Sequence, residues 1–526
     1  MSRRSFVVVA LVLALTVGLF GSALAQEPQK GGTLVFGRGS DAVRLDPADV
    51  TDGESVKVIT NVFEGLVKYK EGSTEVRPAL ATQWRVSEDG KVWEFKLREG
   101  VKFHDGSPFT ADDVVFTFKR QMNEDHPFHK GDFAYWGYMY NMVKDVEKVN
   151  EYQVKITLTQ PYAPFIYNLA TFPAFIVCEE AMRDMGVEEF RNNPVGTGPF
   201  EFVNWEHGST ITLERYEDYW GDNAYLDKVV FSVVPENTTR VMGLKGDDLD
   251  MIDNIGPQNI ESIRADDSLK LLTQPGMNVG YLAMNNLEEP FDNKLVRQAI
   301  NWAVDKEAII EGAYQGTAEP AKNPLPPTLW GYNDEVEDYG YDPEKAKELL
   351  EKAGYPDGFS AELWYMSNPR PYMPNGKKVA QAVQSNLKDI GVDIELVTYD
   401  WGTYLEKTEN AEHDMALLGW IGDNGDPDNF IYVLLDKDNT KKGSAGNIAF
   451  YRSDPLHNIL MQAQKTMGNQ QVRAGLYKAA QHVIHEDAPW VPLSHVTKAM
   501  GAAQDVNGYV IHPTGGVYLQ NTWIEQ

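Results

Sequence analysis

Two loops of this sequence carry charged residues that could recognise a small charged ligand. Arg370 stands between Pro369 and Pro371, and the two prolines restrict the backbone more than in an ordinary surface loop. A guanidinium held in this way can bind a carboxylate through two parallel hydrogen bonds, although most isolated loop arginines are solvated or structural. Asp423 lies in the second loop, residues 420–428, whose Gly, Asn and Asp residues are also typical of turns. The residue types alone leave both a binding site and ordinary turns open.

Neither loop matches a metal site or a catalytic motif. Asp423, Asp426 and Asp428 loosely resemble a calcium loop, but the twelfth position counted from Asp423 is Leu434 instead of a bidentate Glu. The sequence also lacks the patterns G-x-S-x-G, H-E-x-x-H, G-x-x-x-x-G-K-[ST] and C-x-x-C. We therefore predict no catalytic residue, no metal and no cofactor, and we expect that the protein is not an enzyme.

Four aromatic residues accompany the two loops in the sequence, namely Tyr372, Tyr399, Trp401 and Trp420. Their rings could form the flat apolar walls of a binding site, with hydroxyl or indole groups as hydrogen-bond donors. Packing in the core of the fold explains each of them equally well.

Alternating strands and helices in the second half of the chain bring the two loops to one place. Strands are predicted at residues 361–366, 392–399 and 414–419, with helices at 379–390 and 402–408 between them. This order predicts right-handed crossovers and a parallel sheet covered by helices. Since ligands collect beyond the carboxyl ends of parallel strands, the loops that follow the first and last of these strands are the predicted site.

The rest of the chain supplies further elements. Asp342 and Pro343 predict the start of a helix, which Gly354 ends. The first half is richer in strands, predicted at residues 33–37, 92–98, 153–158, 199–203 and 209–214. Because the chain shows no internal repeat or flexible linker, we expect its domains to be joined by compact crossings.

The amino terminus predicts export. Arg3 and Arg4 precede an apolar run at residues 6–20, and the small residues before Gln26 suit cleavage after Ala25. The run is too short for a spanning helix, and no Cys follows it that could carry a lipid. We therefore predict a soluble periplasmic protein with residues 1–25 as its signal peptide.

Composition limits the partners. Without those 25 residues the chain of 526 keeps 501, enough for two or three domains. The signal takes two of the 48 Lys and Arg residues, which leaves 46 against 77 acidic residues and a formal charge of −31. This charge argues against nucleic acid and anionic membranes as partners. The single cysteine, Cys178, lies in an apolar run and excludes an internal disulfide.

Several segments resemble the peptide- and nickel-class extracellular solute-binding proteins of bacterial ABC importers. The most specific is residues 194–200 (PVGTGPF), which runs on through 213–215 (LER) to 218–221 (DYWG). Similarity extends over nearly the whole mature chain, at residues 31–34, 93–98, 103–106, 296–299 and 341–346. Residues 370–372 (RPY) and 419–430 are most similar to the dipeptide-binding branch, from which the chain departs in having no pair of cysteines for a disulfide.

The resemblance implies an α/β fold, two-lobed and periplasmic-binding-protein-like, with an extra inserted domain and with mixed and parallel sheets flanked by helices. Domain I would be built from residues 26–65, 182–278 and 497–526, domain II from 66–181 and domain III from 279–496. The lobes would rotate about two crossings, near 278 and 497, and close over the ligand.

The resemblance also implies roles for single residues. Asp423 would bind the α-ammonium group of a peptide, and Arg370 would bind its α-carboxylate. A fixed separation of these two side chains would favour dipeptides over longer peptides. The other expected ligand contacts are Trp401, Trp420, Tyr372 and the backbone of Gly53 in domain I.

The expected partners are a short peptide and the permease subunits of an inner-membrane ABC importer with their ATPases, and we expect a monomer. Alternatives within the family are glutathione, haem, a nickel complex or an oligosaccharide, against which the opposed charges of Arg370 and Asp423 argue. The alternative from another class is a secreted peptidase, against which the missing catalytic motifs argue.

Overall fold

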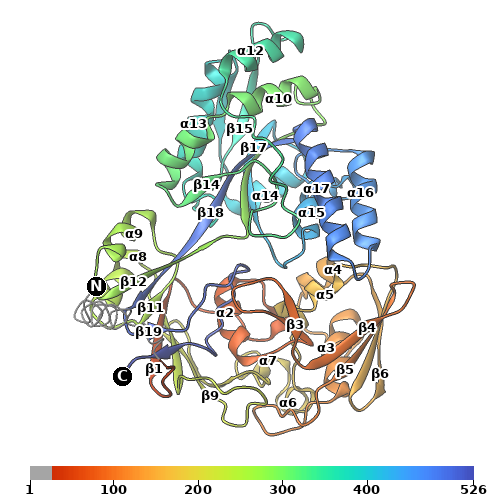
Figure 1. Ribbon diagram of the computed structural model, residues 1–526, viewed down its shortest axis with the longest axis vertical. Helices are drawn as coiled ribbons and strands as arrows, with labels where there is room; N and C mark the ends of the chain where they lie inside the picture. Colours follow the sequence, from red (N-terminus) through yellow and green to blue (C-terminus); the bar gives the residue numbers. More distant parts are fainter. Residues whose placement is uncertain (1–26) are drawn as a thin grey trace, which may run out of the picture.

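One long strand, β18 (Trp490–Ala503), runs through both lobes of the protein (Figure 1). The computed structural model describes residues 27–526, and the predicted signal peptide, residues 1–25, lies outside the described residues. In the upper lobe of the view, β18 pairs with β13 (Asn278–Met284), and in the lower lobe it pairs with β12 (Leu269–Pro275). Since β12 leads directly into β13, two neighbouring lengths of chain pass between the lobes.

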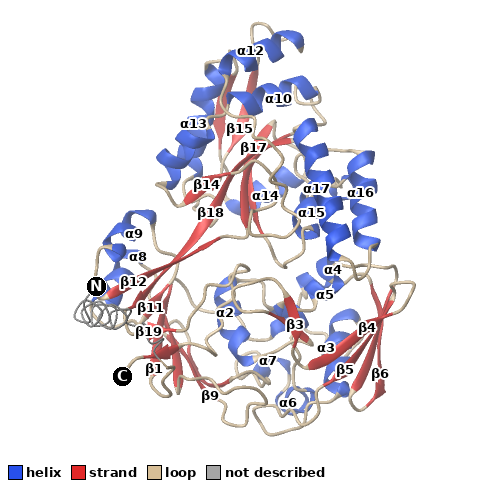
Figure 2. Ribbon diagram, viewed as in Figure 1, coloured by secondary structure: helices blue, strands red, loops and turns tan. Residues whose placement is uncertain are grey.

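This pairing produces one sheet of twelve strands that extends over both lobes (Figure 2). The order along it is β16-β15-β17-β13-β18-β11-β1-β10-β9-β8, with β12 and β14 also paired to β18. The bounds of the strands not yet located are β1 (Thr33–Arg38), β8 (Phe200–Glu206), β9 (Thr210–Arg215), β10 (Lys228–Val233), β11 (Met251–Ile252), β14 (Ala318–Pro320), β15 (Ser360–Trp364), β16 (Asp393–Val397) and β17 (Met415–Ile421).

The upper lobe has the predicted alternation of strands and helices. Helix α13 (Gly376–Lys388) connects β15 to β16, and α14 (Trp401–Glu409) connects β16 to β17. Strand β15 is parallel to both β16 and β17, which confirms the predicted parallel pairing. Strand β17 is antiparallel to β13, so the sheet as a whole is mixed.

Capping residues explain where helix α12 (Pro343–Lys352) begins and ends. The Asp342 carboxylate accepts a hydrogen bond from the backbone N–H of Lys345 at 2.9 Å, and Pro343 occupies the first turn. Gly354 follows the helix with a φ of +94°, a conformation that glycine adopts without strain. The predicted helix is confirmed.

The lower lobe adds a four-stranded antiparallel sheet in the order β4-β5-β7-β6. Helix α3 (Ala111–Met122) lies against β6 and β7. The strands predicted in the first half of the chain correspond to β1, β5, β7, β8 and β9 and are confirmed. The bounds of this second sheet are β4 (Ala81–Val86), β5 (Val92–Leu97), β6 (Val143–Asn150) and β7 (Gln153–Leu158).

The other α-helices lie around the two sheets, and α4 and α5 lie where the lobes meet (Figure 2). They are α2 (Gly53–Val62), α4 (Ala134–Met139), α5 (Phe165–Asn168), α6 (Glu179–Met185), α7 (Val187–Phe190), α8 (Asn237–Lys245), α9 (Pro257–Arg264), α10 (Lys294–Ala303), α11 (Lys306–Ile309), α15 (Asp428–Leu435), α16 (Asp454–Lys465) and α17 (Gln470–Asp487). Short strands pair as β2 (Val67–Tyr69) with β3 (Val76–Pro78) and β19 (Val506–Asn507) with β20 (Trp523–Ile524). Within residues 27–526, no helix combines the length and the apolar character needed to span a bilayer.

Each lobe has its own hydrophobic core. The upper core is formed by side chains between Met277 and Leu493, and the lower core by side chains from Leu34 to Met251 together with others from Met500 to Leu519. A smaller cluster packs α8 and α9 against β11 and β12. The predicted domain boundaries stay a prediction, and β18 passes through the one at 496/497 without a break.

The lobes also touch at α4 and α5, on the side away from β18 (Figure 1). The hydroxyl of Tyr162 donates to Asp428 Oδ2 at 3.0 Å. The side chain of Asn424 donates to Asn168 Oδ1 at 2.6 Å. The chain therefore adopts an arrangement in which the loop after β17 contacts the opposite lobe.

A buried ion pair fixes this same loop to α17. Two nitrogens of the Arg473 guanidinium donate to the Asp426 carboxylate at 2.5 and 2.8 Å, and the hydroxyl of Tyr477 donates to it at 3.2 Å. The exposed fraction is 0% for the Asp426 side chain and 4% for that of Arg473. Because the charges are paired and hydrogen-bonded, the loop that carries Asp423 is held in one position.

We predict that Arg473→Met destabilises the upper lobe by about 3–5 kcal/mol, because it leaves the Asp426 carboxylate buried without its partner. The midpoint of urea unfolding, followed by tryptophan fluorescence, measures this change. Adding Asp426→Asn should recover part of the loss, and Lys347→Ala, at an exposed ion pair, should leave the midpoint unchanged. An Arg473→Met variant as stable as the parent would show that the pair does not hold the loop.

Candidate ligand-binding site

A cavity of about 930 Å³ lies between the lobes. Its wall includes residues from both loops predicted as the site, Arg370 and Asp423, together with Gly53 from the lower lobe. The two loops follow β15 and β17, so they meet at the carboxyl edge of the parallel strands, as the strand order predicts. Three of the six predicted contact residues thus line one cavity.

Asp423 presents a carboxylate to this cavity. Its backbone N–H donates to Asn429 Oδ1 at 2.8 Å, and its Oδ2 accepts from Asn429 Nδ2 at 3.2 Å. Burial raises the pKa of Asp423 to about 6, and hydrogen bonds from Asn429 and Tyr138 act in the opposite direction. Asp423 has no ion pair within residues 27–526, so a cationic ligand group would be its first partner of opposite charge.

Trp420 supports Asp423 from behind. Its indole N–H donates to Asn429 Oδ1 at 3.1 Å, the same oxygen that accepts from the Asp423 backbone. Its ring meets that of Tyr138 edge-on at 6.5 Å between centroids. The structure therefore places Trp420 in the network that orients Asp423, and Trp420 is not among the residues that line the cavity.

Arg370 is held by its backbone and by an aromatic ring. Its N–H and C=O exchange hydrogen bonds with Met373 at 3.1 and 2.9 Å, which closes the turn around Pro371. The guanidinium carbon lies 3.5 Å from the centroid of the Trp401 ring. Arg370 has no ion pair in the described chain, and its buried Nε has no hydrogen-bond acceptor there. The guanidinium is thus positioned, desolvated on one face and free to bind an anion.

Trp401 and Tyr372 lie in supporting positions. Trp401 stands at the start of α14 and stacks on Tyr404 with an interplanar angle of 11°. Tyr372 is 7% exposed and packs in the core, where a Cβ at Gly419 would lie 2.2 Å from its ring. Its hydroxyl points to Met366 Sδ at 3.8 Å, and burial raises its pKa to about 12. Neither residue lines the cavity, so core packing is the explanation that the structure favours for Tyr372.

Gly53 begins α2 on the opposite wall. Asp52 caps this helix by accepting from the Ser55 backbone N–H at 2.8 Å. A Cβ added to Gly53 would meet no atom within 4 Å, so the space beside its backbone is open. Backbone amides at a helix start can donate to a ligand that enters from this side.

The sequence reading missed a group of charges on the lower-lobe wall of the cavity, formed by Glu54, Lys57, Asp253 and Lys498. Lys57 donates to Glu54 Oε1 at 2.7 Å and also pairs with Asp253. These residues come from α2, from the segment after β11 and from β18, so no local motif unites them. Only the crossing of β18 between the lobes brings them together.

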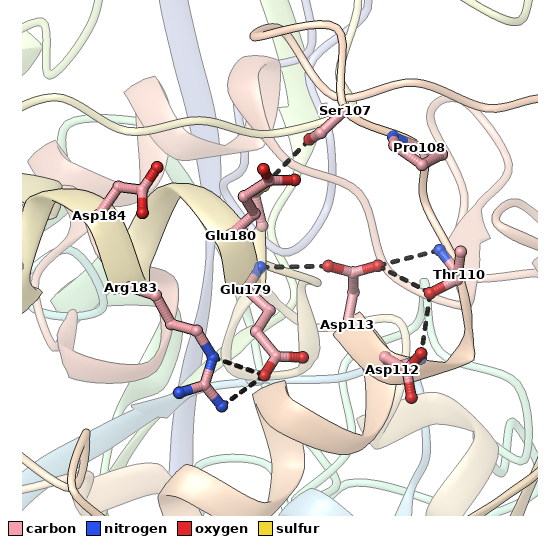
Figure 3. Close-up of a pocket in the computed structure, with 10 residues that line it drawn as sticks. Ser107, Pro108, Thr110, Asp112, Asp113, Glu179, Glu180, Arg183 and Asp184 are labelled. Atoms are coloured by element: carbon pink, nitrogen blue, oxygen red, sulfur yellow. Dashed lines mark hydrogen bonds and ion pairs between the residues drawn. The ribbon is translucent and has the colours of Figure 1, made fainter.

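A second pocket of about 340 Å³ lies on the lower lobe between α3 and α6 (Figure 3). Three of its five acidic residues, Asp112, Asp113 and Glu179, have partners within the protein. The Asp113 carboxylate accepts from the backbone N–H groups of Thr110 and Glu179 at 2.9 and 3.1 Å, and Arg183 pairs with Glu179 (Figure 3). Burial raises the pKa of Asp113 to about 6 and that of Cys178 to about 12, so this thiol is held neutral. Because most of these groups already have partners and both predicted loops line the larger cavity, we place the ligand site there.

Within residues 27–526, one cluster of side chains has the types and spacing that could hold a metal ion, namely Asp436, Asp438 and His457. Both oxygens of Asp436 lie 3.1 Å from His457 Nδ1, and Asp436 Oδ1 accepts from the Asp438 backbone N–H at 2.9 Å. These local bonds explain the group without an ion, and none of the three residues lines the cavity.

Comparison with known proteins identifies, along most of the chain, the family that the sequence segments resemble. Residues 75–442 match the model of the bacterial extracellular solute-binding proteins, family 5 (middle part). The chain is 39% identical over 530 residues to the dipeptide-binding protein of Escherichia coli (strain K12), covering 98% of each chain. It is 40% identical over 499 residues to heme-binding protein A of Haemophilus influenzae, covering 92% of this chain and 90% of that one.

A solved structure also matches nearly the whole fold. It is the ABC transporter-associated periplasmic binding protein DppA from Helicobacter pylori in complex with the peptide STSA. The TM-score is 0.79 at 37% sequence identity, over 95% of this chain and 99% of that one. Together with the family model and the full-length relatives, this match shows that the chain belongs to the family 5 bacterial extracellular solute-binding proteins, two-lobed α/β receptors.

Proposed function

We propose that this protein is the substrate-binding receptor of an ABC peptide importer and that it captures short peptides between its lobes. The observation that carries the proposal is the pair Asp423 and Arg370. These side chains have opposite charges, they reach one cavity from two strand ends, and neither has an ion pair in the described chain.

A zwitterionic ligand satisfies both charges at once. The α-ammonium group of a peptide would bind Asp423, and its α-carboxylate would bind Arg370 through two parallel hydrogen bonds. The main chain between them would lie close to the open backbone at Gly53. Trp401 and Trp420 act through the charged residues, since one stacks on the guanidinium and the other orients the loop of Asp423.

The names of the relatives support a peptide and keep haem as the second candidate. The relative from E. coli is named for dipeptides, and the H. pylori structure contains a four-residue peptide. The relative from H. influenzae is named for heme at nearly the same identity. Calorimetric titration of the refolded, ligand-free protein with dipeptides, tripeptides, glutathione, haem and a nickel complex separates these ligands.

We further propose that the lobes close by rotating about the paired crossings. The Asn278 side chain exchanges two hydrogen bonds of 2.8 Å with the Val496 backbone, which ties one crossing to the other. Ligand-dependent closure would create the surface that docks on the permease subunits of the importer, whose ATPases drive transport. The protein would act as an exported monomer without enzymatic activity, and recovery of unchanged peptide after prolonged incubation tests the last point.

We predict that Arg370→Ala and Asp423→Ala each weaken dipeptide binding by about 2–5 kcal/mol, because each leaves one ligand charge buried without its partner. Titration calorimetry of Ala-Ala measures the loss. Arg264→Ala and Asp454→Ala are matched controls, since these side chains are 55% and 80% exposed and should bind as the parent does. Near-native affinity in a correctly folded Arg370 or Asp423 variant would remove that residue from its role.

We predict that dipeptides bind more tightly than tri- or tetra-alanine. An extended residue advances about 3.3–3.6 Å, so each added residue moves one terminal charge away from a fixed partner. N-acetylation or C-terminal amidation should cost about as much as deleting the matching side chain. A matched series of di-, tri- and tetra-alanine, free and end-blocked, tests whether the separation of Asp423 and Arg370 selects peptide length. The longer peptides are essential, because the H. pylori relative was solved with a tetrapeptide. Equal affinity for dipeptides and tetrapeptides would exclude length selection by these two residues.

We predict that dipeptide affinity falls as the pH drops below about 6. The ligand-free pKa of Asp423 is about 6, and a bound ammonium group would lower it, so binding below that pH must release a proton. Affinity is therefore complete above the ligand-free pKa and declines by up to about tenfold per pH unit below it. Calorimetry between pH 5 and 7.5 measures the slope, which Asp423→Asn should abolish. A flat profile in the parent would contradict Asp423 as the ammonium partner.

A further inference from the structure

Lys498 places a third charge on the cavity wall, apart from Asp423 and Arg370. It lies on β18, where residues 496–500 all line the cavity. Its ammonium group donates to the carbonyl of Pro513 at 3.2 Å. Gly515 has a φ of +90°, and a Cβ there would lie 2.8 Å from Lys498 Nζ. The loop after Pro513 thus fits closely around the ammonium group and holds it in place.

Within residues 27–526, the ammonium group of Lys498 has no anionic partner at ion-pair distance. No carboxylate of the described chain forms an ion pair with it. Of the three acids on the lower-lobe wall, Glu54 and Asp253 bind Lys57, and Asp52 accepts from the Ser55 backbone N–H. Burial, followed by the charge of Lys57, lowers the pKa of Lys498 to about 8, and Asp253 acts against this change. At neutral pH the group is still mainly charged. The Lys498 ammonium group therefore donates to one neutral acceptor, the Pro513 carbonyl, and has further N–H donors available.

We propose that Lys498 is a specificity-determining residue that binds an acidic side chain of the peptide. The inference rests on the proposed function, in which Asp423 and Arg370 take the two terminal charges of the ligand. The only ligand charge left for Lys498 is then an additional carboxylate. An anion bound there replaces the water that the ammonium group lost on burial, and a charge-assisted hydrogen bond forms.

The same wall contains features that would favour a basic side chain. Glu54 Oε2 and Asp253 Oδ1 are buried and have no hydrogen-bond partner in the described chain. Both carboxylates contact Lys57 through their other oxygens, but one ammonium group balances the charge of only one of them. Lys498 has no ion pair in the described chain, so its N–H donors are available to an added anion, whereas the unbalanced carboxylate beside Lys57 favours a cation. The titration with Ala-Lys separates these two possibilities.

The test compares peptides that differ by one group. Glu-Ala and Ala-Glu are titrated beside their isosteric Gln forms, with Ala-Ala as the reference and Ala-Lys as the opposite charge. We expect at least one Glu peptide to bind about tenfold tighter than its Gln form. In Lys498→Met this ratio should fall below about twofold, while Ala-Ala affinity stays within about threefold of the parent. Lys352→Met removes a lysine that is 60% exposed and should keep the full ratio.

The outcomes separate this inference from the proposed function. Failure of every dipeptide, Ala-Ala included, to bind the parent would remove the proposed function and this inference with it. Binding of Ala-Ala with no preference for Glu over Gln in the parent would overturn the role of Lys498 alone. A Glu preference that persists in Lys498→Met, or tighter binding of Ala-Lys than of the Gln forms, would show that groups other than Lys498 determine the side-chain preference. The parent comparison needs no variant, so a misfolded Lys498→Met would not leave the inference untested.

Discussion

Strand β18 pairs with β13 in the upper lobe and with β12 in the lower lobe, and the arrangement of the site depends on this continuous strand. A sheet connection is stiffer than two loops, because each strand restrains the dihedral angles of the other through the ladder. The Asn278 side chain adds two hydrogen bonds between the crossings. The lobes therefore face each other along one axis, and the cavity lies beside it.

Charge governs what this cavity can hold. Burying an ionised group without a partner is costly, and the protein limits this cost by pairing most of its buried charges internally. The pairs Asp426–Arg473 and Asp46–Arg120 have almost no exposed side-chain area. Asp423, Arg370 and Lys498 differ from them in having no ion pair among the described residues, 27–526, and all three line the cavity. A ligand with complementary charges gains most by binding at these three positions.

The loop from 423 to 429 connects recognition to the contact between lobes. Asp423 reaches the cavity, whereas Asn424 and Asp428 bond to the opposite lobe. Asp428 is itself a buried carboxyl, whose pKa burial and Asp426 raise to about 7. One segment thus both lines the cavity and contacts the opposite lobe, which is the kind of link that the proposed closure on a ligand would use.

Much of the upper lobe could be predicted from sequence, because its signals are local. Alternating strand and helix periods predicted that β15, β16 and β17 are parallel, and Asp342 with Gly354 predicted the limits of α12. The same order placed the loops of Arg370 and Asp423 at one edge. The sequence by itself therefore determined the fold class and the family, and it predicted the two loops whose charged side chains line the cavity.

Only the tertiary structure decided which neighbours those charges have. Tyr372 follows Arg370 closely in the sequence, yet it packs in the core against Gly419, and Trp420 orients Asp423 through Asn429. Lys498 is separated from Arg370 by more than a hundred residues, so no spacing rule could join them. Burial, pairing and facing direction are properties of contacts between distant segments, and they arise only when β18 aligns the two lobes around one cavity.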